Sequence, residues 1–62
     1  MSILEKLQRT IKALDDRKLD ARKFDEGNTA AGVRVRVAAM EAIKALKECR
    51  KDIQEIRNNR KS

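Results

Sequence analysis

The chain has 62 residues and a formal net charge of +6, and it contains one cysteine, Cys49, and no histidine. One domain, residues 1–62, is all that this length allows, and it offers little apolar area to offset the entropy of ordering the chain. A single cysteine excludes an intrachain disulfide, and without histidine no zinc ligand set is plausible, so we expect no metal and no cofactor. Oligomerisation is the remaining means of stabilisation, and we expect a homodimer or tetramer.

Catalysis and membrane insertion have little support in the sequence. Gly27 and Gly32 are isolated, so there is no glycine-rich phosphate loop, and the acidic residues near Asp15 lie among Lys and Arg, as in surface ion pairs. A chain this small and poor in aromatic residues offers little room for a small-molecule substrate, so we do not expect an enzyme. No apolar run approaches the roughly 18 residues of a membrane span, and the N-terminus does not resemble a signal peptide. The expected compartment is the cytoplasm.

The first expected element is a helix over residues 3–25. Ser2 and Glu5 have the spacing of a capping box, which predicts that the helix begins at Ile3. Gly27 suits a left-handed residue just after a helix, and Asn28 or Thr29 suits the N-cap of the next one, so residues 26–29 are expected to form a turn. The apolar stripe of this first helix consists of Leu4, Leu7, Ile11 and Leu14.

A second, longer helix is expected over residues 30–58, followed by a basic C-terminal end at 59–62. Small and apolar residues recur along it at alternating steps of four and three, the heptad seam of a coiled coil. Residues 33–37 also alternate with the period of a strand, but no second run of this kind exists to pair with it. Cys49 suits a small core position, or a position that could cross-link two copies on oxidation. The predicted seam consists of Val35, Ala39, Ala42, Leu46, Cys49, Ile53 and Ile56.

These two helices and the short turn between them predict an all-α fold. A connection of two to four residues favours neighbouring antiparallel helices, which gives a helical hairpin. We expect such hairpins to assemble through their apolar seams into a dimeric or higher helical bundle. The number of copies and the way in which they dock remain open.

Basic residues are concentrated in the second half of the chain. Residues 1–27 contain seven Lys or Arg and six Asp or Glu, whereas residues 28–62 contain nine and four. This excess favours nucleic acid as the partner over an anionic membrane, since the basic face lacks the bulky apolar flank of interfacial helices. The near-absence of aromatic residues disfavours stacking on single strands, and the phosphate backbone of double-stranded DNA is the expected contact. The candidate DNA contacts are Arg34, Arg36, Lys44, Lys47, Arg50, Lys51, Arg57, Arg60 and Lys61.

The segment Gly27–Arg36 resembles a motif of the bacterial linker-histone-like proteins, the family known from the chlamydial nucleoprotein. It contains Gly-Asn, paired alanines and two arginines one residue apart, and the downstream order of Glu, Lys and Arg-Lys is similar, so the resemblance covers about residues 24–57. It implies a nucleoid-associated protein that condenses DNA without strict sequence choice. Matching residue by residue, it implies DNA contacts at Arg34, Arg36, Arg50 and Lys51.

The sequence departs from this family in one respect. Chlamydial-type members continue into a long Lys/Ala-rich tail, whereas the sequence ends at Ser62, so we expect an oligomer with several basic faces to replace the tail. The alternative is a helical-bundle adaptor that binds RNA or another protein, because the same seam supports it equally well. Gel retardation of duplex DNA beside structured RNA separates the two.

Overall fold

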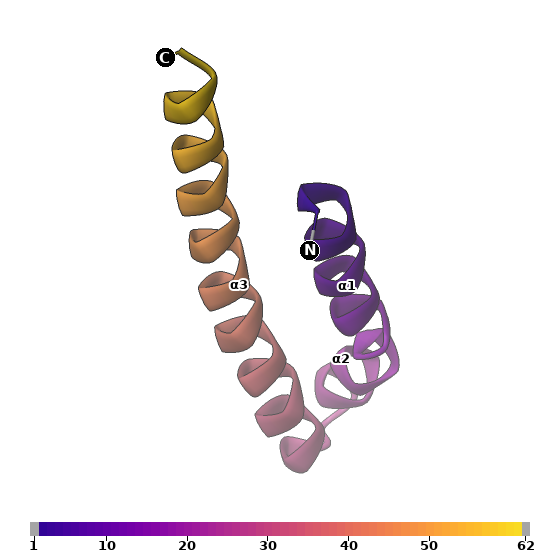
Figure 1. Cartoon of the computed structure of the whole chain (residues 1–62). Coiled ribbons are helices and arrows are strands. Elements are labelled where there is room, and N and C mark those ends of the chain that lie inside the picture. The colour runs from indigo at the N-terminus through magenta and orange to yellow at the C-terminus, as the bar shows by residue number, and fades with distance from the viewer. Residues whose placement is uncertain (1, 62) are drawn as a thin grey trace.

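The computed structural model describes residues 2–61, and the side chains of residues 2–60. Within these residues it contains three helices and no strand: α1 over Ile3–Asp15, α2 over Lys18–Asp25 and α3 over Thr29–Lys61 (Figure 1). The all-α prediction is confirmed. The segment 33–37, which alternates like a strand, lies inside α3. No helix in the described part of the chain is long and apolar enough to cross a membrane.

The first helix is interrupted, which the sequence did not predict. The Asp16 N–H still bonds to the Lys12 carbonyl at 2.9 Å, but the Arg17 N–H bonds to the Leu14 carbonyl, at 3.0 Å, which tightens the turn. Two aspartates precede Arg17, and aspartate is a weak helix former, so the helix yields here without Gly or Pro. The second helix also differs at both ends, since α3 begins at Thr29 rather than residue 30 and continues to Lys61 rather than ending at residue 58.

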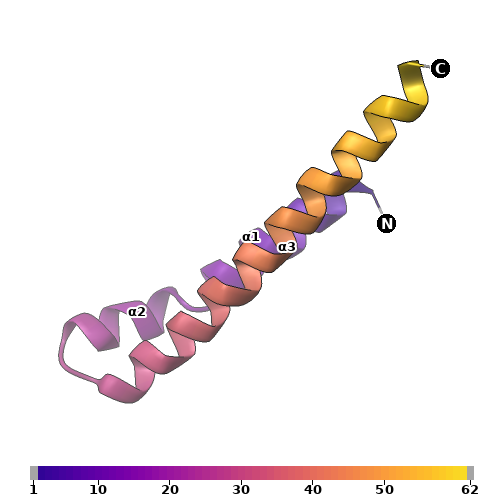
Figure 2. The same cartoon turned by 90° about the vertical axis from the view of Figure 1, so that its left-hand side faces the viewer.

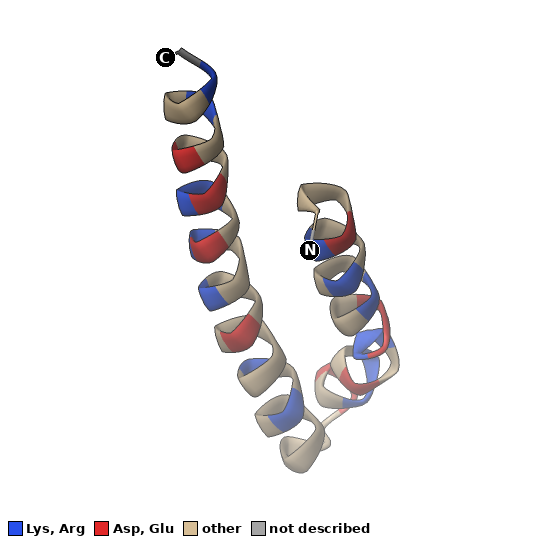
Figure 3. Cartoon of the chain, in the orientation of Figure 1, with Lys and Arg blue, Asp and Glu red and all other residues tan. Residues whose placement is uncertain are grey.

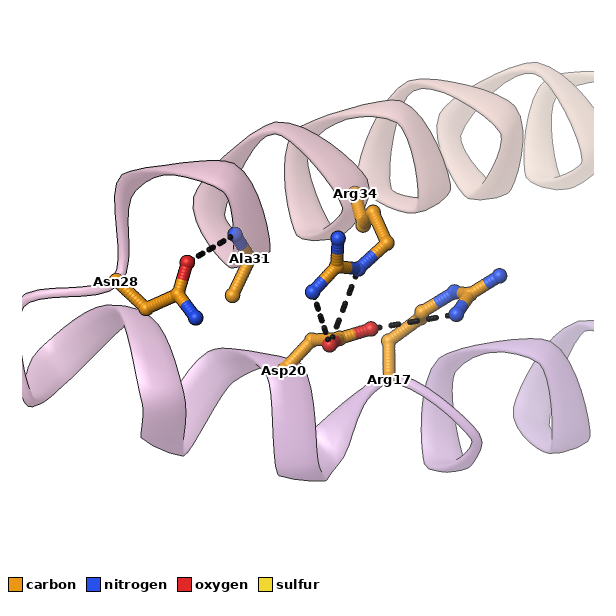
Figure 4. Close-up of polar contacts among 5 residues, drawn as sticks. All are labelled: Arg17, Asp20, Asn28, Ala31 and Arg34. Carbon is orange, nitrogen blue, oxygen red and sulfur yellow. Dashed lines mark hydrogen bonds and ion pairs between the residues drawn. The ribbon is translucent and has the colours of Figure 1, made fainter.

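The corner between α2 and α3 forms as its residue types predict. Gly27 has φ +107°, and the N–H groups of Gly27 and Asn28 bond to the carbonyls of Phe24 and Lys23, both at 2.9 Å. This pattern is a Schellman motif, which satisfies the last carbonyls of α2. Asn28 then caps α3, because its side-chain oxygen accepts a hydrogen bond from the Ala31 N–H at 3.1 Å (Figure 4).

After this corner, α3 returns alongside α2 and α1, and its last turns extend beyond α1 (Figures 1 and 2). The Cα atoms span 54 × 15 × 14 Å. The side of α3 that faces the other arm repeats at steps of four and three, and small residues dominate it. It consists of Ala31, Val35, Ala38, Ala42, Ala45, Cys49 and Asp52, of which Ala31 and Cys49 are buried and the others half-buried. We call these residues the alanine seam.

The alanine seam shares only Val35, Ala42 and Cys49 with the seam expected from the sequence. Alanine lets two helices approach closely, whereas larger aliphatic side chains would hold them apart. The larger residues of the expected seam therefore lie outside the contact between the arms. Ala39, Leu46, Ile53 and Ile56 are exposed in the single chain, as are Leu4, Leu7, Ile11 and Leu14 of the first arm.

Within the described residues, two ion pairs connect the arms. At the open end Lys6 pairs with Asp52. Nearer the corner Arg34 donates from Nε and Nη2 to Oδ1 of Asp20, at 3.2 and 3.0 Å, and Arg17 donates to Oδ2 of Asp20 at 3.2 Å (Figure 4). The hydrogen bonds from Arg34 lower the pKa of Asp20 below its ordinary value of 3.8, partial burial opposes this effect, and Arg17 adds to it.

Close to the corner, the ring of Phe24 lies against Gly32. A Cβ atom at Gly32 would lie 2.7 Å from Cε2 of Phe24, a separation that real contacts do not show, and 3.1 Å from Cγ, which is tighter than most contacts. Gly32 thus permits this approach of α2 to α3, at the cost of the lower helix propensity of glycine.

We expect the effect of Gly32→Ala to depend on Phe24. In the wild type, the gain in helix propensity is offset by displacement of the ring. In a Phe24→Ala background nothing opposes the gain, so the same substitution should be more favourable there, by about 1 kcal/mol in the free energy of unfolding. Urea unfolding of the four variants, at one protein concentration, measures the difference. Equal effects in both backgrounds would contradict the packing of Phe24 on Gly32.

We also expect Asp20 to make stability depend on acid pH. Its folded pKa is lowered, so its contribution is present above the ordinary carboxyl pKa of 3.8 and is lost as the pH falls through the lowered value. Thermal unfolding should show Asp20→Asn less stable than the wild type at pH 7, and the two should converge towards pH 2. The control is Asp25→Asn, because Asp25 makes no ion pair within the described residues. A constant gap between wild type and Asp20→Asn would refute the coupling.

Candidate nucleic-acid interface

The side of α3 that points away from the other arm carries a set of exposed cations, with the exposed Val33 and Met40 among them. At 100° per residue, its charged positions fall within about 120° of one another, opposite the alanine seam. All are exposed, and none forms an ion pair with a carboxylate of residues 2–60. We call this set the cationic strip, and it consists of Arg36, Lys44, Lys47, Arg50 and Lys51.

The carboxylates of α3 lie elsewhere on the helix. At the same 100° per residue, Glu41, Glu48 and Glu55 fall on one flank, about 100° from the middle of the alanine seam. Asp52 belongs to the seam and pairs with Lys6 of α1. Figure 3 shows basic and acidic positions on both arms, so what distinguishes α3 is their separation around the helix. Positive charge on the cationic strip is therefore not neutralised by neighbours on the same strip.

The densest part of the cationic strip is slightly hollowed. Lys47, Arg50, Lys51 and Gln54 line a shallow depression of about 300 Å³. Three cations and one amide therefore converge within eight residues of one helix, and each of these side chains can donate hydrogen bonds. Such a surface suits phosphate oxygens, which accept from Lys and Arg.

The remaining candidate contacts from the sequence have different surroundings. Arg34 is bound by Asp20, so its guanidinium has a partner within the chain. Arg57 and Arg60 are exposed on the last turns of α3, and the side chain of Lys61 lies outside the described residues. The cluster of Arg17, Asp20 and Arg34 is not apparent from the sequence. The pair Arg17 and Asp20 is visible as an i,i+3 spacing, but the approach of Arg34 depends on the register between the arms.

Two other depressions offer no alternative chemistry. The one between the arms, about 320 Å³, mixes Arg9 and Arg17 with Asp16 and Glu41 around alanines. The one near the corner, about 520 Å³, is mostly apolar and includes Phe24. Within the described residues, no group of three His, Cys, Asp or Glu could hold a metal ion. The cationic strip is thus the candidate site, and the chemistry it supports is binding of a polyanion.

Comparison with known proteins identifies the family. The family model of the histone H1-like protein Hc1 matches residues 1–59, nearly the whole chain. No curated protein and no solved structure matches the chain. The match agrees with the resemblance of the Gly27–Arg36 segment, and it extends over both arms. The chain therefore belongs to the histone H1-like Hc1 family, a structural DNA-binding family of the nucleoid.

Proposed function

We propose that this protein binds double-stranded DNA without sequence preference, through the cationic strip, and compacts DNA in the cytoplasmic nucleoid as an oligomer. The observation that carries the proposal is the strip itself: five exposed cations, none paired with a carboxylate of residues 2–60, on a helix of a chain whose family binds DNA. Nothing in the proposal requires catalysis, a metal or a cofactor.

The chemistry of the cationic strip favours the phosphate backbone over the bases. Lys and Arg on flexible stems neutralise phosphates and release counterions, which supplies affinity without reading sequence. Arg36 and Lys51 lie 15 residues apart, about 22 Å along a helix, so one strip can contact several phosphates. Base stacking needs aromatic rings. The single aromatic residue, Phe24, belongs to α2, and its ring lies against Gly32 of α3. Duplex DNA is thus the better ligand than a single strand.

In this proposal the protomer is an antiparallel helical hairpin, and several hairpins join in a helical bundle. The cationic strip provides the main contacts. Arg57, Arg60 and Lys61 add positive potential at the end of α3. Arg34 adds to the field but keeps Asp20 as its partner, so we assign it a smaller share of DNA affinity than the sequence alone indicates.

We expect the triple variant Lys47→Ala/Arg50→Ala/Lys51→Ala to bind random duplex DNA more weakly. The slope of log affinity against log salt should become shallower by about 0.9 for each phosphate that the variant no longer neutralises. Fluorescence anisotropy between about 50 and 200 mM salt measures both quantities, because affinity changes steeply in this range. A second, sequence-unrelated duplex should give the same affinities.

A matched control removes the same charge from the other arm. Lys12, Arg22 and Lys23 are exposed and form no ion pair within the described residues. Changing these three to Ala also lowers the formal charge from +6 to +3, since each triple variant removes three cations. The control should retain most of the affinity and slope. If both triples weaken binding equally, the net charge binds DNA and the cationic strip is not a site. If structured RNA binds more tightly than duplex DNA, the alternative as an RNA-binding module is correct.

A further inference from the structure

One broad face of the folded-back chain is mostly apolar and uncovered, with Arg50 among its aliphatic side chains. It contains large aliphatic side chains from both arms, each 38–64% exposed. The alanine seam and its counterpart on α1, which includes Ile3, Lys6 and Thr10, already hold the arms together. The large aliphatic side chains are therefore not needed for the contact between the arms. We call this set the apolar face: Leu4, Leu7, Ile11 and Leu14 of α1 with Ile43, Leu46 and Ile53 of α3.

Helix geometry places both rows on the same side. On α1 the apolar residues follow the contact positions by one residue, as Leu7 follows Lys6 and Ile11 follows Thr10. On α3 they do the same, as Leu46 follows Ala45 and Ile53 follows Asp52. One residue is a rotation of 100° in the same sense on each helix. Because the two helices run in opposite directions, these rotations bring both rows to one side of the pair.

The apolar face is better suited to a constitutive interface than to a transient one. Within the described residues only Ala31 and Cys49 are buried apolar residues, and no large side chain is fully buried. A chain of this size with so small an interior gains its stability by association. A second copy is the partner that is present wherever the chain is made. A two-fold axis pairs the apolar face with itself, as in most homodimers.

We infer that a second copy covers the apolar face with its α3 over the α1 of the first, so that the two cationic strips point to opposite sides of the dimer and hold two DNA duplexes. The inference rests on the proposed function, because the strips are the DNA-binding surfaces. It adds the geometry of the dimer and the bridging of duplexes.

Two copies of the apolar face can meet with α3 over α3 or with α3 over α1, and the charges beside the apolar rows favour the second arrangement. On α3, Arg50 lies within the apolar row, between Leu46 and Ile53 along the helix, whereas Arg36 and Lys47 flank the row on its outer side. No carboxylate lies among these three cations. If α3 lay over α3, these cations would meet their own copies, and like charges repel. On α1 the corresponding flank carries Gln8 and Asp15, which are neutral and acidic. The cationic flank of α3 therefore fits the flank of α1.

The positions of the two apolar rows along the helix axes also favour the dimer with α3 over α1. Thr10 and Ala13 line one depression together with Ala42 and Ala45, so the middle of α1 lies level with this part of α3. A two-fold axis parallel to the helices keeps every residue level with its copy. Ile43 and Leu46 then lie over the apolar row of the partner's α1 without any sliding. In this dimer the α3 helices occupy diagonal corners, and their outer sides face away from each other.

Distances between spin labels test this geometry. Val33 and Lys47 lie on the outer side of α3, at 200° and 160° from Cys49, and both are exposed. Each is changed to Cys in a Cys49→Ala background, labelled, and measured by pulsed dipolar spectroscopy without DNA. Diagonal α3 helices give similar distances at both positions, about 30 Å or more, since packed helix axes lie 8–10 Å apart and the labels point outward.

Other arrangements give different results. If α3 lies over α3 in opposite directions, the two-fold axis crosses the apolar row near Leu46. Lys47 then lies about level with its copy, whereas Val33, about 20 Å from the axis along the helix, is displaced by about 40 Å from its copy, so the two distances differ by about 20 Å or more. Light scattering on the same samples gives the mass. A different pair of distances, or a monomer at the concentration of the measurement, would overturn the inference.

A bridging experiment separates this inference from the proposed function. One duplex is fixed to beads, the unlabelled wild-type protein is added, and a second, fluorescent duplex is offered. Retention of the fluorescent duplex supports the inference, and salt should release it. If the protein retards duplex DNA in a gel but the beads retain no second duplex, the bridging is wrong while the proposed function stands. If no duplex is retarded at all, the proposed function fails, and the label distances still decide the dimer geometry.

Discussion

The close approach of the two arms depends on alanine. Ala38, Ala42 and Ala45 occupy consecutive contact positions on α3, and their small side chains let α1 lie directly against the helix. The larger side chains consequently lie on the surrounding surface. Leucine and isoleucine form a separate apolar face one residue further round each helix, and the cations occupy the outer side of α3. A larger side chain in the alanine seam would alter the spacing of the arms and, with it, both other surfaces.

The separation of residue types around α3 explains how one helix serves several contacts. The seam contacts the other arm, one flank is apolar, the outer side is cationic, and the remaining flank carries Glu41, Glu48 and Glu55. These carboxylates lower the net charge and border the edge of the strip formed by Lys44 and Lys51, but they form no ion pair with it within residues 2–60. Arg34 shows the opposite case: its guanidinium is bound to Asp20 and holds the corner end of the arms together. Two cations in one short sequence motif, Arg34 and Arg36, therefore have different surroundings in the fold.

The sequence predicted the all-α class, the corner and its caps, because these depend on local chemistry. Ser2, Gly27 and Asn28 behave as their residue types require, whatever the rest of the chain does. It did not predict which side of α3 faces the first arm, because two heptad rows both satisfy the pattern. These rows share Val35, Ala42 and Cys49 and differ by one residue at the positions between them. Hydrophobicity favours the row with larger residues, whereas the row rich in alanine makes the contact. The break at Arg17 is not predicted because neither Gly nor Pro marks it. The pairs Lys6–Asp52 and Arg34–Asp20 depend on register between the arms, which no local pattern contains.

The small interior of the single chain implies that the stability of the protein depends on its concentration. Among the residues described, only Ala31 and Cys49 are buried apolar residues. If association stabilises the chain, as we propose, its folded fraction rises with local concentration. Copies bound along a polyanion are held near one another, which raises that concentration far above the value in free solution. Occupancy of the chromosome and structural integrity would then increase together, and surplus unbound copies would be the ones exposed to proteases.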